Sequence, residues 1–481
     1  MSSAGKIFKN TGALAVGRII TKAASLVFLG YVTRVLGESG FGRFSTAMAL
    51  VGFVEIFPGY IGRTYIIRQF AREREASGPF LSGVLASNVL LSFALFFEMI
   101  LVVPLLGYAG DTNTACLVLA ASLLFSSLTN SYHALFAGHE RMELSAYADV
   151  FNTALTIALA VPVLAMGGQV VALVGAYAGA RVVTFFLARR FARPLLDDSR
   201  FIRPSAALLK TMSIGAWPFF ITQLFIIFYN RADIVMLSFM NQPMDKEIAV
   251  GHYNAAYKLM EAMGLVTSAF VAAVYPVLAR KFLEGADGVL VTFRKAFRIL
   301  AAFVFPVAVG TTILASDLMG LLFGESFAGA ALALQILIWG QAMDSINPLA
   351  AVTMRALEKE RDLARITGVC AVFNVALNIV LIPRFSYNGA AAATLLSFLL
   401  VYVWSRHVLA RELGTLHIVA PVVRTIVASA AMGAVVWWAR AYGLAAAIAA
   451  GVAAYALFAA VLGVMSREEW NLVTARFRRA S

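Results

Sequence analysis

Ionisable side chains interrupt the long apolar stretches of this sequence. Placing a Lys or Arg at the centre of a membrane helix costs about 2.5–3.5 kcal/mol even on the mildest scale. Such groups therefore face one another or a wet cavity, and several cations around one cavity suit an anionic group such as a phosphate. The polar residues that we assign to substrate binding are Arg18, Lys22, Arg181, Asn230, Arg231 and Lys258.

Arg18 and Lys22 are four residues apart, so they share one face of a helix. At a rise of about 1.5 Å per residue they lie roughly 12 and 18 Å from the inner end of the first predicted span. We expect them to form a cationic wall. The alternative is that Glu55, on the neighbouring helix, neutralises the pair.

A second group of charges lies in the outer half of the membrane, where the seventh predicted span ends and the eighth begins. It is expected to bind a headgroup or to form a gate whose ion pairs hold one conformation closed. Purely structural pairing, of Arg231 with Glu261 or of Lys258 with Asp233, stays open. The acids that we assign to coupling or gating are Glu55, Glu98, Asp233 and Glu261.

Proton or sodium coupling through Glu55 or Glu98 also stays open, because any membrane-buried carboxylate has the same sequence signature. We expect no metal site and no cofactor. The sequence has no GxxxxGK[ST] phosphate loop, and His139–Glu143 lacks the second histidine of an HExxH zinc motif. No loop is long enough for a glycosyltransferase or ligase domain, so we expect a protein that is not an enzyme.

The composition requires a membrane protein. Hydrophobic residues make up 61% of the chain, charged residues 14%, and the mean hydropathy is +0.82. A soluble domain averages about 45–50% apolar and about 25% charged residues. Cys116 and Cys370 lie in separate apolar runs and are expected to be small core residues, not a disulfide.

A membrane helix needs about 20 mostly apolar residues, and on that basis we predict an all-α polytopic protein with fourteen transmembrane helices. The connections are short and leave no room for a soluble domain. The predicted spans are about 10–36, 40–62, 80–107, 114–137, 144–166, 169–190, 209–240, 249–278, 294–315, 328–353, 362–383, 387–411, 418–438 and 442–465.

The distribution of Lys and Arg predicts the orientation. With the N-terminus in the cytoplasm, most loop cations are cytoplasmic, as the positive-inside rule requires. We therefore expect a multi-pass protein of the cytoplasmic (inner) membrane with both termini cytoplasmic. The same asymmetry accounts for the pI of about 9.9 without nucleic acid as a partner. The outer loops keep only Arg34, Arg43, Lys246, Arg384 and Arg440.

The chain contains traces of an internal duplication. Val150–Pro162, VFNTALTIALAVP, returns about 222 residues later as Val372–Pro383, VFNVALNIVLIP. His139-Glu140-Arg141 pairs in the same way with Lys359-Glu360-Arg361. Upstream, Gly42-x-Phe44-x-x-Ala47 pairs with Gly251-x-Tyr253-x-x-Ala256, about 209 residues apart. Four such matches in one order, with Arg68-x-Phe70 and Arg280-x-Phe282 as the fourth, favour duplication over chance.

The duplication predicts two six-helix lobes that enter the membrane in the same direction and are related by a pseudo-twofold axis along the membrane normal. Residues 1–205 would form the N-lobe and residues 206–412 the C-lobe. Residues 413–481 would hold two extra helices and a cytoplasmic tail. Between the first lobe's second and third spans, Arg63–Ser77 is expected to be a surface helix on the cytoplasmic leaflet or a solvated loop.

The stretch Thr11–Gly42 resembles the first span and turn of Wzx-type polysaccharide-transporter flippases. Tyr229–Asp233, Gly251–Lys258 and Asn374–Gly389 are similar to later segments of that group. The chain thus resembles the multidrug/oligosaccharidyl-lipid/polysaccharide (MOP) exporter superfamily over nearly its whole length. The resemblance implies two lobes that work by alternating access, and its extra helix pair points to flippases of lipid-linked sugars, including the lipid II flippase.

In those relatives a basic central cavity takes the diphosphate headgroup, and Arg18, Lys22, Arg231 and Lys258 match it in type and location. The intramembrane acids make this cavity less uniformly cationic than the resemblance implies. We therefore expect a secondary transporter that flips a polyprenyl-diphosphate oligosaccharide for surface polysaccharide export. Its partners would be that substrate, membrane lipids, and a polysaccharide polymerase or glycosyltransferases, and it would be a monomer.

Three alternatives stay open. The intramembrane acids suit a cation-coupled exporter of drugs or other small molecules. The extra helix pair suits a lipid II flippase. A cavity whose charges are all paired, with no route to either side, would suit a scaffold for envelope assembly.

Overall fold

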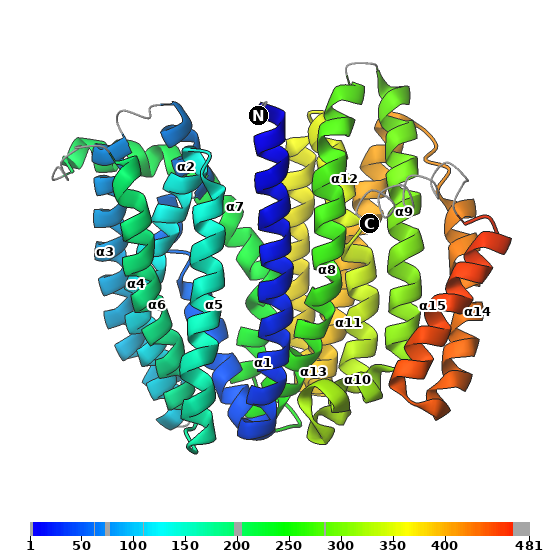
Figure 1. Cartoon of the computed structure of the whole chain (residues 1–481), viewed down its shortest axis with the longest axis horizontal. Coiled ribbons are helices and arrows are strands. Elements are labelled where there is room, and N and C mark those ends of the chain that lie inside the picture. Colours follow the sequence, from blue (N-terminus) through cyan, green and yellow to red (C-terminus); the bar gives the residue numbers. More distant parts are fainter. Residues whose placement is uncertain are drawn as a thin grey trace. The chain divides into compact units, whose positions relative to one another are not determined.

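A computed structural model describes residues 3–61, 63–72, 77–108, 110–196, 204–282 and 285–464, and every regular element in these ranges is a helix (Figure 1). The α-helices are α1 Ser3–Val54, α2 Arg63–Arg72, α3 Ser77–Val102, α4 Gly110–Gly138, α5 Met142–Ala165, α6 Val170–Ala192, α7 Ala206–Phe239, α8 Lys246–Phe282, α9 Ala286–Ile313, α10 Ala315–Phe323, α11 Ala331–Asp344, α12 Asn347–Ala356, α13 Glu360–Leu413, α14 Val419–Ala439 and α15 Leu444–Val461. Short 3-10 helices are η1 Pro58–Ile61, η2 Val103–Leu106, η3 Arg193–Leu195, η4 Glu325–Ala330 and η5 Arg440–Tyr442.

Within the described ranges, ten helical segments are long and apolar enough to cross a membrane. They include α3 with η2, α4, α5, α6, α8, α9, the η4–α12 segment, α13, α14 and α15. The prediction of an all-helical, multi-pass membrane protein is therefore confirmed.

The longest helix, α13, is a hairpin of two segments. Its 54 residues would extend about 81 Å if straight, far more than a bilayer core of about 30 Å. Ser386 breaks it with a φ of 52°. Lys359, just before the first turn, places its Nζ 2.7 Å from Oε1 of Glu412, near the last turn. The two ends of α13 can meet only because the chain reverses at Ser386.

A second break lies in α1, at Gly37, whose φ is 67° and ψ is −174°. This φ lies in the left-handed region, which glycine adopts without steric cost. The break falls between the first two predicted spans, so α1 consists of one segment before Gly37 and another after it. The second segment carries Ser39, Gly42 and Arg43.

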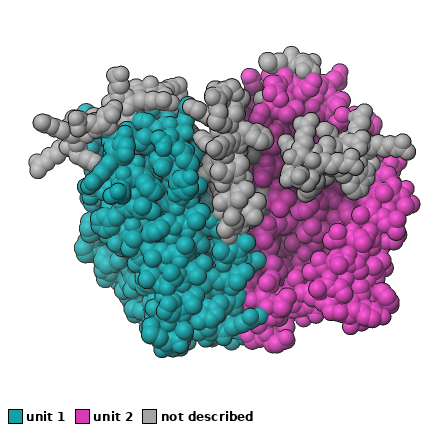
Figure 2. All heavy atoms as spheres, viewed as in Figure 1, with its two compact units in different colours: residues 1–254 teal, residues 255–481 magenta. Residues whose placement is uncertain are grey.

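The chain divides into two compact units, residues 1–254 and residues 255–481 (Figure 2). Unit 1 holds α1 to α7 and the start of α8, and unit 2 holds the rest of α8 and the helices after it. The boundary of a compact unit is not the boundary of a sequence repeat. The predicted lobes, 1–205 and 206–412, and the appendage 413–481 remain predictions.

The turns after α4 and after α12 share one backbone geometry. Glu140 and Glu358 both have a φ of 59°, which non-glycine residues rarely adopt. In both turns the glutamate amide donates to the carbonyl three residues back, and the following amide, of Arg141 or Lys359, donates to the carbonyl five residues back. The same pair of hydrogen bonds follows α5, at Gly167 and Gly168, and α15, at Gly463 and Val464, so it is a common way to end a helix. The sequence pairing of His139–Arg141 with Lys359–Arg361 therefore remains a prediction.

In unit 1, α4 packs against α1, α2, α3 and α6. Small polar residues hold it to α3: Asn88 donates to Oγ of Ser131 at 2.8 Å, and the hydroxyls of Ser92 and Ser127 lie 3.2 Å apart. Small side chains let membrane helices approach closely, and hydrogen bonds between them stabilise the contact. This packing fixes the orientation of α4, whose first turn holds residues of the candidate site.

Helix α2 is confirmed as a helix, and its apolar face is partly buried. Ile66 and Phe70 are buried, with Phe80 of α3, Leu135 of α4 and Met212 of α7 in the same cluster. The pattern of Arg63–Ser77 is equally typical of a surface helix on a membrane and of a helix that packs on protein. The burial of these two residues shows that part of the apolar face packs on protein, and the position of α2 at the cytoplasmic leaflet remains a prediction.

In unit 2, α9 packs against α11 and α14, and α14 packs against α15. Leu314, Met432, Val436 and Ala447 join their ends in one buried cluster. The last two helices therefore fold onto α9 within their own unit.

The buried position of Phe70 makes a prediction about stability. Phe70→Ala should destabilise the protein by about 3–5 kcal/mol, because it leaves a cavity in the α2–α3–α4–α7 cluster. Phe97→Ala is the matched control, since Phe97 is 61% exposed on α3. Thermal unfolding in lipid nanodiscs measures both. Equal melting temperatures for the two variants would contradict the packing described for α2.

Candidate functional site

Two helices distant in sequence cross with their backbones in contact inside unit 1. They are the second segment of α1 and the first turns of α8, and they meet at the glycines of the two sequence motifs, Gly42 and Gly251. A Cβ added to Gly42 would overlap the carbonyl oxygen of Glu247. A Cβ added to Gly251 would lie 2.6 Å from the carbonyl oxygen of Glu38 and 3.3 Å from the amide nitrogen of Gly42. Only glycine permits this approach at either position.

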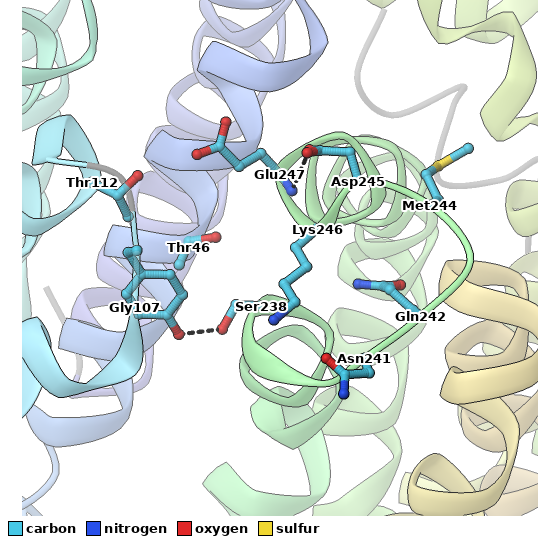
Figure 3. A pocket seen from close by; sticks show the side chains of 11 residues that line it. Thr46, Gly107, Thr112, Ser238, Asn241, Gln242, Met244, Asp245, Lys246 and Glu247 are labelled. Carbon is cyan, nitrogen blue, oxygen red and sulfur yellow. Dashed lines mark hydrogen bonds between the residues drawn. The ribbon is translucent and has the colours of Figure 1, made fainter.

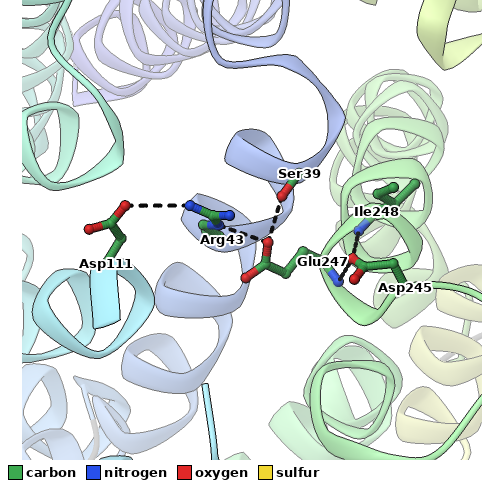
Figure 4. A network of polar contacts seen from close by, with 6 residues as sticks. All are labelled: Ser39, Arg43, Asp111, Asp245, Glu247 and Ile248. Carbon is green, nitrogen blue, oxygen red and sulfur yellow. Dashed lines mark hydrogen bonds and ion pairs between the residues drawn. The ribbon is translucent and has the colours of Figure 1, made fainter. Parts of the chain in front are cut away.

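Charged side chains connect the same two helices (Figure 4). Glu247 Oε2 accepts hydrogen bonds from Oγ of Ser39 at 2.5 Å and from Nε of Arg43 at 2.7 Å. Nη1 of Arg43 also lies 3.4 Å from Oδ2 of Asp111, at the start of α4. Arg43 and Glu247 are about a third and a quarter exposed. One arginine therefore joins the starts of α4 and α8 to α1.

Further along the crossing, the contacts are buried. Asn254 donates to Oγ of Ser45 at 2.7 Å, and both side chains are nearly inaccessible. Nε2 of His252 lies 3.5 Å from Oε1 of Glu38. Polar contacts thus run along the whole crossing. Because each polar group has a specific partner, they fix the position of α1 along α8.

The start of α8 is capped by the residue before it. Oδ1 of Asp245 accepts from the amides of Glu247 at 2.9 Å and Ile248 at 3.1 Å. A carboxylate at this position satisfies free amides and also interacts favourably with the positive end of the helix dipole. Nζ of Lys246 donates to the carbonyl of Phe239, at the end of α7, at 2.9 Å. The α7–α8 turn is therefore held at both ends.

A polar cavity of about 550 Å³ lies beside this turn (Figure 3). Thr46 lines it from α1, Thr112 from α4, Ser238 from α7, Asn241 from the turn and Lys246 from α8. All of these residues belong to unit 1. The cavity thus exists because the crossing brings α1, α4, α7 and α8 to one place.

Tyr108, in the turn between η2 and α4, also lines the cavity. Its hydroxyl lies 2.7 Å from Oγ of Ser238, whose own proton is donated to the carbonyl of Val235 at 2.6 Å. A hydroxyl has one proton, so Tyr108 is the donor to Ser238. Burial raises the pKa of Tyr108 above its usual value, and its hydroxyl stays protonated near neutral pH.

Two of the predicted site residues meet in unit 1. Nη1 of Arg181, on α6, donates to Oγ of Ser122 on α4 at 3.0 Å. Nη2 of Arg181 lies 3.9 Å from Oε2 of Glu55, just after α1. The cation assigned to substrate binding and the acid assigned to coupling therefore form an ion pair, and both are less than a third exposed.

The charges of α7 and α8 have local partners. Nζ of Lys258 lies 2.8 Å from Oε2 of Glu261, three residues along the same helix. Oδ2 of Asp233 accepts a hydrogen bond from the hydroxyl of Tyr253, and this carboxylate is only 2% exposed. Arg231 is half-buried. The roles assigned to these residues, including the alternative pairings, remain predictions.

The other predicted residues are not gathered with these pairs. Lys22 is exposed on α1 and Glu98 is exposed on α3, within unit 1. The side chains of Arg18 and Asn230 lie outside the described part of the structure, so their assignment also remains a prediction.

Sequence reasoning missed the polar residues of the crossing. Arg43 and Lys246 were treated only as outer-loop charges, and Asp111 and Glu247 were not singled out. One signal was available: short loops that hold these cations also hold acids nearby in sequence. The pairing of Gly42 with Gly251 in the duplication marked the place where the two helices meet.

Solved structures share this all-helical, multi-pass architecture. The lipid II flippase MurJ, in an inward closed conformation, matches with a TM-score of 0.77 at 14% identity, over 93% of this chain and 98% of that one. An inward-facing multidrug resistance MATE family transporter of the MOP superfamily matches with a TM-score of 0.64 at 16% identity, over 82% of this chain and 95% of that one.

Residues 7–282 match the family described as "Polysaccharide biosynthesis protein", and the chain belongs to that family. A probable low-salt glycan biosynthesis flippase, Agl15, of Haloferax volcanii is 24% identical over 80% of each chain. The lipopolysaccharide biosynthesis protein WzxC of Escherichia coli is 22% identical over 81% of this chain and 77% of that one. The resemblance stated from the sequence is confirmed.

The contact at Gly42 makes a second prediction. Gly42→Ala should destabilise the protein by about 1–3 kcal/mol, because the new methyl group forces the helices apart. Gly52→Ala is the control on the same helix: nothing lies within 4 Å of its added Cβ, so it should be neutral or stabilising by about 0.5–1 kcal/mol. Melting temperatures in nanodiscs compare the two. A Gly42→Ala protein as stable as Gly52→Ala would contradict the close approach.

Proposed function

We propose that the protein carries a lipid-linked oligosaccharide across the cytoplasmic membrane by alternating access. The observation that carries this proposal is membership of a polysaccharide biosynthesis family over more than half of the chain. Support comes from relatives whose names describe a glycan biosynthesis flippase, an O-antigen transporter and a lipopolysaccharide biosynthesis protein. The fold, shared with MurJ and with MATE transporters, suits the same activity.

The proposal includes fourteen membrane spans in two related lobes plus two extra helices. The ten candidate spans become fourteen when α13 counts as two segments, α1 as two and α7 as one. The meeting of Gly42 with Gly251, which the sequence pairs with each other, is consistent with a duplicated chain.

The proposal also sets an orientation, with both termini in the cytoplasm. The Lys and Arg distribution supports it. The break at Gly37 ends the first span, so the Gly42–Gly251 crossing and the polar cavity would then face the outside. The close contact of α1 with α8 at Gly42 and Gly251 would then close the substrate path on the outer side.

For the substrate we propose a polyprenyl diphosphate carrier with its glycan destined for surface polysaccharide. Arg18, Lys22 and Arg231, with Arg181, Asn230 and Lys258, would contact the diphosphate. The ion pairs Arg181–Glu55 and Lys258–Glu261 support cations that are held in place before the substrate arrives. The lipid tail would stay in the bilayer, and a polymerase and glycosyltransferases would act on either side of the step.

A second candidate is a cation-coupled exporter of drugs or other small molecules. It is favoured by the likeness of the fold to a multidrug resistance transporter. Proton or sodium coupling through Glu55 or Glu98, with Asp233 and Glu261 as gating groups, would fit either function. Raised drug sensitivity in a deletion strain with unchanged surface glycan would favour this candidate.

The proposal predicts the effect of removing single cations. Arg18→Ala, Lys22→Ala and Arg231→Ala should each reduce surface-glycan export at least tenfold in a strain that lacks the native gene. A hydrogen bond to a charged group contributes about 1.5–3 kcal/mol, which corresponds to about a tenfold or larger effect. Lectin staining of whole cells, normalised to protein level, measures export.

Arg424→Ala is the matched control, because Arg424 is an exposed cation on α14, outside the predicted repeats. It should keep normal export. Normal export in all three test variants at wild-type protein levels would overturn the proposed headgroup site.

A further inference from the structure

The cavity beside the α7–α8 turn contains a buried polar group that the protein leaves unsatisfied. Thr112, in the first turn of α4, is 1% exposed, and its Oγ1 has no hydrogen-bond partner in the part of the chain that the structure describes. Leaving a buried donor or acceptor unpaired costs about 1–3 kcal/mol. Thr112 lines the cavity, and its Oγ1 lies in the wall, closed to a water molecule (Figure 3). A rotation of this side chain about χ1 would let a ligand supply the missing hydrogen bond.

The lining of this cavity is polar but has little free charge. Both of its acids are engaged, since Asp245 caps α8 and Glu247 binds Ser39 and Arg43. The ammonium group of Lys246 donates to the carbonyl of Phe239 and retains further donors. Metal ions and apolar drugs are poor matches for such a lining.

The remaining groups suit a ligand that is rich in hydroxyls. Asn241 is exposed and offers an amide. Thr46 and Thr112 carry hydroxyls that both donate and accept, but these side chains lie in the wall, 3% and 1% exposed. Tyr108 lines the cavity as well. Small-molecule sites have volumes of about 300–1,000 Å³, and the cavity of about 550 Å³ falls in this range. A pyranose presents several hydroxyls that each donate and accept, around an apolar ring face.

We propose that this cavity is a sugar-binding site, separate from the cations assigned to the diphosphate, that takes one or two uncharged pyranose units of the glycan. The inference rests on the proposed function for the source of the sugar. In the proposed orientation the site faces the outside, where the glycan emerges.

Occupancy of the site has a conformational consequence. Its walls come from both sides of the Gly42–Gly251 crossing: α1 and α4 on one side, and α7 and α8 on the other. A ligand that contacts both sides binds better when α1 and α8 are in contact than when they are apart. It therefore shifts the conformational equilibrium toward the state in which the two helices touch. A free glycan on the outside would therefore slow reopening of the path.

The test measures binding of neutral sugars to the full chain in lipid nanodiscs, because maltoside detergents would themselves present sugar to the site. The probes are lactose, maltose, mannobiose and N,N′-diacetylchitobiose, each followed by saturation-transfer NMR. Wild-type protein should bind at least one probe. Thr112→Val keeps the shape of the side chain but removes its hydroxyl, and it should weaken that binding about fivefold or more.

The matched control is Thr114→Val on the same helix, whose Oγ1 already donates to the carbonyl of Gly110 at 3.0 Å. It lies outside the cavity and should bind the probe as wild type does. Wild-type protein that binds none of the probes, or Thr112→Val protein that binds as tightly as Thr114→Val, would overturn the inference.

Export assays separate this inference from the proposed function. Export that depends on Arg18 and Lys22, in a protein that binds no probe, would leave the function standing and remove the sugar site. Sugar binding that depends on Thr112, in a protein whose absence leaves surface glycan unchanged, would keep the site and remove the proposed function. The outer face of right-side-out vesicles corresponds to the outside of the cell, where the site opens in the proposed orientation. High millimolar lactose or maltose added outside such vesicles should slow export by the wild-type protein more than export by the Thr112→Val protein.

Discussion

The contact between Gly42 and Gly251 is the constraint on which the described site depends. The absence of side chains at these two positions lets the backbones of α1 and α8 touch. At that separation Ser39 and Arg43 reach Glu247, and Asn254 reaches Ser45. The same approach brings α4, through Asp111 and Thr112, to the side of the α7–α8 turn. The ion network and the polar cavity are therefore consequences of one close crossing.

The intramembrane charges follow a common rule. A charge without a partner in a low-dielectric interior is expensive, and its cost falls when an opposite charge or a hydrogen-bond donor lies nearby. Arg181 has Glu55 and Ser122, Lys258 has Glu261, and Asp233 has the hydroxyl of Tyr253. These partners come from neighbouring or identical helices, so each pair can persist through a movement of larger parts of the protein. In the proposed headgroup site, a cation held in this way would already be ordered for an anionic ligand.

Much of the architecture could be predicted from sequence, because apolar length and charge placement are strong signals for membrane helices. The breaks at Gly37 and Ser386 fall between the predicted spans on either side. The partners of individual charges could not be predicted, since periodicity gives the face of a helix and not its neighbour. The buried face of α2 was missed because lipid and protein select the same apolar residues.

The chemistry of the crossing also bears on how a path could open there. The contacts of Glu247 with Ser39 and Arg43 are partly solvated, so each contributes far less than a buried ion pair would. Water can replace these partners when the helices separate, whereas an apolar seal of the same size would expose surface with no compensation. Alternating access requires two states whose free energies differ by only a few kcal/mol. A crossing made from backbone contact at two glycines and exchangeable polar groups meets that requirement: it defines the joined state sharply, by steric fit, while it keeps the free energy of separation small.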